Sequence, residues 1–165
     1  MNVDRILSEL RAGQVDYLLI GGMNFLLRHV PELTFDVDIW VRDTPANLER
    51  LNMALRRMGG AWGPTENQWA AVPEDWRWLE RQMVFCLTTD HGALDVFRTV
   101  RGLENRYDEC RESATEARTA AEISFLSLSD THMLACQEAL PPGERKQRRM
   151  EILREAIQRQ QKGTT

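Results

Sequence analysis

The spacing of apolar and polar residues predicts a strand, a turn, a helix and a second strand near the start of the chain. Residues 17–20 (YLLI) form an apolar run that predicts a short buried strand, and Gly21-Gly22 end it. Residues 23–29 fit a short helix. In residues 34–41 apolar and polar side chains alternate, which predicts another strand.

Further patterns extend this series. Residues 83–88 and 93–100 predict two strands joined by a turn at residues 90–92, where Asp-His-Gly stands. Apolar residues at a spacing of three and four predict helices over residues 2–13 and 45–58. Helices and strands that alternate and then lead into a hairpin predict a mixed sheet flanked by helices, an α/β (α+β) fold.

From residue 102 onward the pattern is mainly helical. It predicts three helices and, between the first two, one short strand: residues 104–121, 129–140 and 144–161 for the helices, and 123–126 for the strand. A chain of 165 residues has the usual size of one domain. We therefore expect a single domain over residues 1–165, with its core at 14–100 and a helical C-terminal part at 102–161.

Composition narrows the class of protein. Hydrophobic residues at 42% and charged residues at 28% are typical of a soluble globular protein. No apolar run approaches the roughly 20 residues of a membrane span, and charges interrupt the N-terminal segment, so we expect a cytoplasmic protein with no membrane partner. A net charge of -4 argues against a protein that coats nucleic acid. The three dispersed cysteines indicate neither disulfides nor a zinc site.

Two aspartates stand within the second strand. Aspartate is depleted in strands, so Asp36 and Asp38 in an otherwise apolar stretch need a reason. Side chains two residues apart lie on the same face of a strand. One interpretation is an edge strand with a solvated face. The other is a pair of oxygen ligands for a hard cation, an arrangement used in phosphoryl transfer.

A third aspartate favours the second interpretation. Asp95 stands in the middle of the strand predicted at residues 93–100, between Leu94 and Val96, and faces away from both. A metal site is expected if the two strands bring Asp95 to Asp36 and Asp38.

These elements resemble a known signature. Gly21-Gly22, a helix, the strand TFDVDI (residues 34–39) and later Leu94-Asp95-Val96 look like the nucleotidyltransferase fold of the DNA polymerase beta superfamily. Within it, the chain is similar to the small bacterial AbiEii-type nucleotidyltransferase-like proteins, which share the Thr-x-Asp-hydrophobic-Asp-hydrophobic strand. The resemblance covers residues 17–100 and continues weakly to the C-terminal helix. It implies a mixed sheet flanked by helices, with further helices at the C-terminus.

The resemblance also implies roles for individual residues. Gly21 and Gly22 match the turn at which nucleotide phosphates approach backbone N–H groups. Asp36 and Asp38 match the pair that holds two divalent ions, Mg²⁺ or Mn²⁺. Asp95 matches the third acid, which ligates one ion and helps to take the proton from the attacking hydroxyl. Family members commonly have a small residue after the glycines, whereas this chain has Met23 and Asn24. We expect Asn24 to donate to a phosphate.

The C-terminal helices depart from the family pattern. Similar proteins commonly place a lysine in the helix after the last strand and Arg-x-Lys-Asp at the start of the next helix. This chain has Gln137 at the first place and Arg145-Lys146-Gln147-Arg148 at the second. The basic residues 145–149 either meet phosphate or form a solvated helix face, and the lack of aromatic residues among them favours the solvated face.

Residues 61–81 contain four of the five tryptophans and show no sustained period. We interpret this segment as a structured connection whose indoles pack over the sheet. The alternative is a surface on which nucleobases stack.

Two functions fit these observations. The first is a metal-dependent nucleotidyltransferase, which moves a nucleoside monophosphate from a nucleoside triphosphate to an acceptor. The sequence leaves open whether that acceptor is RNA, a protein or a small molecule. The second is a catalytically inactive module of the same fold, which binds a cognate protein in a toxin-antitoxin or defence system. The three acids favour the enzyme, and the altered C-terminal helices favour the module.

Overall fold

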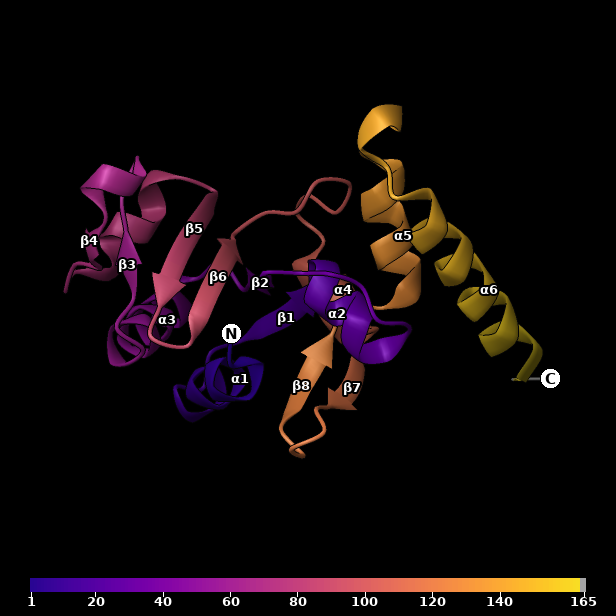
Figure 1. The fold of residues 1–165 in the computed structure, drawn as a ribbon, viewed down its shortest axis with the longest axis horizontal. Helices are drawn as coiled ribbons and strands as arrows, with labels where there is room; N and C mark the ends of the chain where they lie inside the picture. Colours follow the sequence, from indigo (N-terminus) through magenta and orange to yellow (C-terminus); the bar gives the residue numbers. More distant parts are fainter. Residues whose placement is uncertain (164–165) are drawn as a thin grey trace.

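The computed structural model describes residues 1–163, which form one eight-stranded mixed sheet with helices around it (Figure 1). Across the sheet the strands follow the order β4 (Ala70–Ala71), β3 (Ala61–Trp62), β5 (Val84–Thr89), β6 (Gly92–Phe97), β2 (Asp36–Val41), β1 (Tyr17–Ile20), β8 (Ser124–Ser127) and β7 (Thr115–Arg118). Two neighbouring pairs, β2 with β6 and β1 with β8, run parallel, and the other pairs are antiparallel. The predicted fold class is confirmed.

Six α-helices and three short 3₁₀ helices complete the described residues. The α-helices are α1 (Val3–Ala12), α2 (Gly21–Arg28), α3 (Pro45–Arg57), α4 (Tyr107–Glu112), α5 (Asp130–Glu138) and α6 (Gln147–Gly163). The 3₁₀ helices are η1 (Glu66–Gln68), η2 (Trp76–Arg81) and η3 (Pro142–Glu144). No helix within residues 1–163 is both long enough and apolar enough to cross a membrane.

The two faces of the sheet are covered by different helices. Alternate residues of β2, such as Val37 and Ile39, are fully buried against the apolar stripes of α1 and α3. On the opposite face, Leu18 and Trp40 join a second cluster with residues of α4, α5 and α6. Figure 1 shows α5 and α6 side by side at one end of the molecule, away from β3 and β4. The helices that cover the second face therefore lie mainly over β1.

The strands predicted at residues 17–20, 34–41 and 93–100 correspond to β1, β2 and β6, which are neighbours in the middle of the sheet. However, β2 begins at Asp36 and not at residue 34. The hydroxyl of Thr34 donates to Oδ1 of Asp36 at 3.1 Å, so this threonine acts as a partner of the first acid just before the strand.

The helix predicted over residues 104–121 is wrong for most of its length. Only α4 is helical there, and β7 follows it and pairs with β8 in an antiparallel hairpin. Asn105 and Glu122 adopt positive φ, at 61° and 62°, so the chain turns before α4 and again between the two strands. Pairing with β8 has outweighed the helical propensity of this charged segment, and the C-terminal part is not purely helical.

Candidate functional site

The three aspartates meet on one face of the sheet. Because β2 and β6 are parallel neighbours in register, Asp38 lies directly opposite Asp95, and Asp36 lies two residues before Asp38 on the same face. One carboxylate oxygen from each residue lies within 4.8 Å of the other two. The predicted convergence is confirmed. All three residues are half-buried, so solvent reaches the group.

Crowding changes the electrostatics of this triad. Burial, followed by repulsion from Asp36 and Asp95, raises the pKa of Asp38 to about 7. Burial and the charge of Asp36 also raise the pKa of Asp95. A divalent cation among these oxygens would relieve the repulsion, and oxygen-only ligand sets suit Mg²⁺ and Mn²⁺.

The glycine pair lies directly against the triad. Gly21 adopts φ +66°, and a Cβ atom added there would overlap the carboxylate of Asp38. The backbone N–H of Gly22 donates to Asp38, which holds the pKa of this acid below the value that burial alone would produce. No side chain caps the N-terminus of α2, which begins at Gly21. The N-terminus of α2 therefore lies directly against the acids, and one of its backbone N–H groups already binds the carboxylate of Asp38.

Asn24 does not belong to this site, and the expectation that it donates to a phosphate is wrong. Its side chain is fully buried, with 0% exposed surface. The amide group donates to the carbonyl of Leu128 and to Sδ of Met133, both at 3.0 Å, and it accepts from the hydroxyl of Ser127. Asn24 instead joins α2 to the start of α5.

Arg149 is the cation that sequence reasoning missed. It is only 7% exposed, so the expected solvated helix face is wrong at this position. Its guanidinium donates to both carboxylate oxygens of Glu32, at 2.6 and 3.2 Å, and lies over the ring of Phe25. Its positive charge lowers the pKa of Asp38. The sequence indicated this cation only through the basic run 145–149. The helical spacing of that run did not show that Arg149 is the residue that points into the protein.

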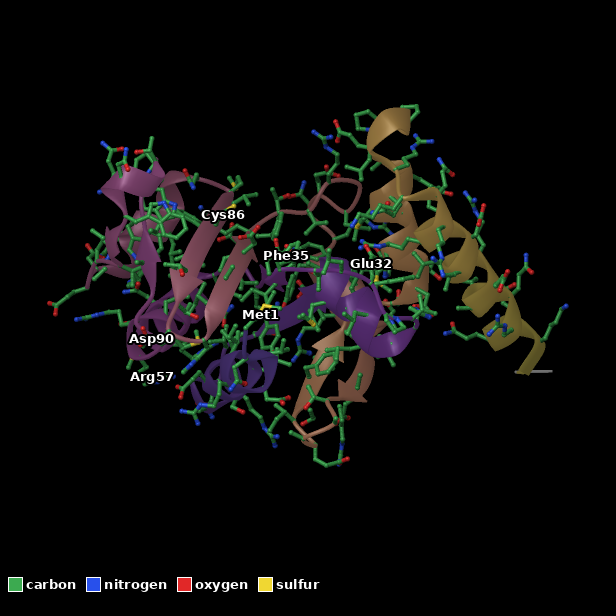
Figure 2. All side chains as sticks on the ribbon, viewed as in Figure 1. Met1, Glu32, Phe35, Arg57, Cys86 and Asp90 are labelled. Atoms are coloured by element: carbon green, nitrogen blue, oxygen red, sulfur yellow. The ribbon has the colours of Figure 1, made fainter. Side chains whose placement is uncertain are left out.

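Figure 2 labels Glu32, the partner of Arg149, in the loop that follows α2. Lys146 also pairs with Glu32, at 2.7 Å, and remains exposed. These contacts attach the beginning of α6 to the loop that leads into β2. The carboxylates on β2 and the guanidinium on α6 are thereby held in one region.

Cys86 is a further neighbour of the acids that the sequence did not indicate. It pairs in register with Asp95, and Figure 2 labels it on β5. Burial, together with the charge of Asp95 and a hydrogen bond to that carboxylate, raises the pKa of the thiol to about 11. Cys86 is therefore a neutral donor to Asp95 at physiological pH.

The interpretation of the tryptophan-rich segment is confirmed for three of its indoles. Trp78 is buried and stacks edge-on against Phe85, and Trp62 and Trp76 pack on the same core. Trp69 differs, because it is 38% exposed and lines an open hollow beside Cys86. The segment as a whole covers the end of the sheet at β3 and β5.

No model of a known protein family matches the chain, and no curated protein matches it. Three carboxylates at this spacing can hold a divalent cation. An uncapped helix N-terminus and a buried guanidinium are groups that bind phosphate.

Proposed function

We propose that this protein is a metal-dependent nucleotidyltransferase of the DNA polymerase beta type, similar to the AbiEii-like proteins. The observation that carries the proposal is the convergence of Asp36, Asp38 and Asp95 beside the glycine turn that opens α2. A solvated edge strand would leave this convergence without a reason, since β2 lies inside the sheet and not at its edge.

In this proposal the three carboxylates hold the divalent ions, Mg²⁺ or Mn²⁺. The bound ions would neutralise charge on the phosphates of the substrate and on the attacking oxygen. The N-terminus of α2 at Gly21 and Gly22 binds the triphosphate through backbone N–H groups, and Arg149 supplies a positive charge on the same side.

The reaction would proceed by in-line displacement. The hydroxyl oxygen of the acceptor forms a bond to the α-phosphorus, the bond from that phosphorus to the bridging oxygen breaks, and pyrophosphate leaves. The proton of the hydroxyl would pass to the carboxylate of Asp95, the third acid of the triad, which is half-buried and reached by solvent. Positioning and charge stabilisation supply most of the catalysis, as in other phosphoryl transfers.

The test is Asp95→Asn, which keeps the shape of the side chain but removes a ligand charge and the proton acceptor. We expect triphosphate binding to remain and nucleotide transfer to fall by roughly 100-fold or more, equivalent to about 2.7 kcal/mol of transition-state stabilisation. The measurement is transfer of radiolabel from each of the four triphosphates to RNA, protein and small-molecule fractions of a cell extract.

Asp90→Asn is the matched control, because Asp90 stands in the turn of the same hairpin and outside the triad. It should transfer label like the wild type. Equal labelling by wild type and Asp95→Asn, or no labelling despite measurable nucleotide binding, would contradict the enzyme. The second outcome would favour the inactive module, whose partner is a cognate protein of a toxin-antitoxin or defence system.

A further inference from the structure

An open hollow of about 510 Å³ lies beside the acidic triad, and we call it the Trp69 hollow. Trp69, Val84 and Cys86 line it, together with part of the segment that connects β3 to β4. Because Cys86 pairs in register with Asp95, these two side chains lie on the same face of the sheet. The Trp69 hollow therefore begins next to the third acid.

The face of the sheet around the hollow is uncovered. Val84, Cys86 and Thr88 alternate along β5 with buried residues, and all three are exposed. The helices on this face, α4, α5 and α6, pack on an apolar cluster to which no described residue of β5 belongs. Figure 1 shows α5 and α6 well away from β5 and β3. A large molecule can therefore approach the triad over β5.

The order of the strands gives the triad two different sides. On one side lies β1, which ends at the Gly21-Gly22 turn, and on the other side lies β5. In the proposed reaction pyrophosphate leaves towards this turn and Arg149. The attacking and leaving oxygens of an in-line displacement lie on opposite sides of the phosphorus. The acceptor hydroxyl therefore arrives over β5, where the Trp69 hollow lies.

The charges around the hollow restrict the class of acceptor. No lysine or arginine lines it among the residues whose side chains the structure describes, and the triad beside it is acidic. Nucleic acids bind to proteins through cations that neutralise their phosphates, so the backbone of an RNA acceptor would find no partner in the hollow. Trp69 instead offers a partly exposed indole, on which an uncharged ring can stack.

Tyrosine is the side chain that carries its hydroxyl group on such a ring. A tyrosine that protrudes from a protein surface can place its ring against Trp69 in this open hollow, with its hydroxyl at the end nearest Cys86 and Asp95. We propose that the acceptor is a tyrosine of another protein, bound in the Trp69 hollow. This inference rests on the proposed function, because it takes the triphosphate to be bound at Gly21 and the triad.

The transfer then forms a phosphodiester on the tyrosine. The phenolic oxygen bonds to the α-phosphorus, the bond from that phosphorus to the bridging oxygen breaks, and pyrophosphate leaves with its electron pair. The phenolic proton passes to the carboxylate of Asp95. The product is a tyrosine that carries one nucleoside monophosphate.

The first experiment compares acceptors for the intact wild-type protein with Mg²⁺ or Mn²⁺ and each of the four α-radiolabelled triphosphates. The acceptors are pools of short peptides with random flanks around a central tyrosine, serine or phenylalanine, and a single-stranded RNA with a free 3′-hydroxyl. We expect the tyrosine pool to take up label at least roughly tenfold faster than each of the other acceptors, equivalent to about 1.4 kcal/mol.

Faster labelling of the RNA or of the serine pool would overturn the tyrosine inference and leave the proposed function standing. Where only the protein fraction of a cell extract is labelled, mass spectrometry identifies the modified residue. An ester on tyrosine would support the inference, and an ester on any other residue would overturn it. Label in no acceptor and in no fraction of the extract would overturn both proposals.

The second experiment removes the ring that lines the hollow. At low peptide concentration, where the rate measures kcat/KM, Trp69→Ala should transfer to the tyrosine pool roughly tenfold more slowly, because the acceptor loses its stacking partner. Binding of the α,β-methylene triphosphate analogues, measured by calorimetry, should be unchanged. Trp69→Phe keeps a ring and should retain most of the rate. Met53→Ala is the control, since it removes an exposed apolar side chain from α3, outside the hollow.

Equal rates for Trp69→Ala and the wild type, or an equal loss in Met53→Ala, would show that the acceptor does not bind at Trp69. Thermal unfolding of the variants checks that they fold. If Trp69→Ala fails to fold, the comparison of acceptors still decides the inference, since it requires no substitution.

Discussion

Gly21 shows how a single residue determines the position of a catalytic candidate. Its φ of +66° is a conformation that residues with a Cβ atom adopt only at a cost. The absence of the Cβ atom also leaves space for the Asp38 carboxylate, which would otherwise be displaced. One position therefore supplies both the turn that opens α2 and the room for an acid on the neighbouring strand.

We predict that Gly21→Ala destabilises the protein by about 2 to 4 kcal/mol, the sum of left-handed backbone strain and the overlap with Asp38. It should also weaken Mg²⁺ binding, because Asp38 must move. Urea denaturation and metal titration measure the two effects. Gly143→Ala is the control, since nothing lies within 4 Å of its added Cβ atom. Comparable losses of stability and of Mg²⁺ affinity in Gly21→Ala and Gly143→Ala would contradict this role of Gly21.

At the scale of elements, the segment that carries the tryptophans closes one end of the core. Trp78 in η2 packs against Trp62 and Phe85, and its indole N–H donates to Oδ1 of Asn52 on α3 at 2.8 Å. Asn52 in turn donates to the carbonyls of Pro73 and Glu74. Packing and hydrogen bonds thus attach an irregular segment to α3 and β5, although it has only two-residue strands of its own.

Trp78→Ala should cost about 3 to 5 kcal/mol in the free energy of unfolding, because it opens a large cavity and leaves Asn52 without its donor. Trp69→Ala should change it by less than about 1 kcal/mol, since that indole is 38% exposed. Chemical denaturation, monitored by circular dichroism, measures the free energy of unfolding of the two variants. If Trp69→Ala lost more unfolding free energy than Trp78→Ala, the exposed indole, and not the buried one, would be the residue that stabilises the segment.

At the scale of the whole molecule, the acidic triad opposes folding at neutral pH unless a cation is bound. The pKa of Asp38 is about 7 in the folded protein, against an ordinary value of 3.8 for an aspartate in an unfolded chain. The folded state therefore holds this proton more tightly than the unfolded state. The stabilisation from the protonated form is complete below pH 3.8, and it is lost as the pH rises towards 7.

We therefore predict that Asp38→Asn and the wild type have similar stability near pH 4 without metal, and that the variant becomes the more stable protein near pH 7.5. The difference at pH 7.5 should be on the order of 3 kcal/mol. Urea denaturation in the presence of a chelator measures it, and comparison with the variant cancels other acids whose pKa is lowered, such as Asp16 and Glu32.

Millimolar Mg²⁺ or Mn²⁺ should then stabilise the wild type at pH 7.5 but not Asp38→Asn, because only the wild type keeps all three carboxylates. A ligand at 100 times its Kd adds about 2.7 kcal/mol. A metal-free variant that is clearly less stable than the wild type at pH 7.5 would indicate that Asp38 has a structural role.

The sequence by itself determined the features that depend on local backbone geometry. The period of two in a strand places Asp36 and Asp38 on one face, and short apolar runs bounded by glycine locate β1 and the hairpin of β5 and β6. These signals are contained within a few consecutive residues. They were sufficient for the fold class, the central strands and the three acids.

Only the tertiary structure decided the features that depend on contacts between distant parts of the chain. Asn24 is bound by Leu128, 104 positions away, which removes it from the site. Arg149 reaches Glu32 across 117 positions, and this contact turns one member of a basic run towards the acids. The helix expected over residues 104–121 gave way to β7 through a nearby partner, because β7 forms a hairpin with β8, which in turn pairs with the distant β1. Local propensity is worth tenths of a kcal/mol per residue, and pairing or burial against a distant partner outweighs it.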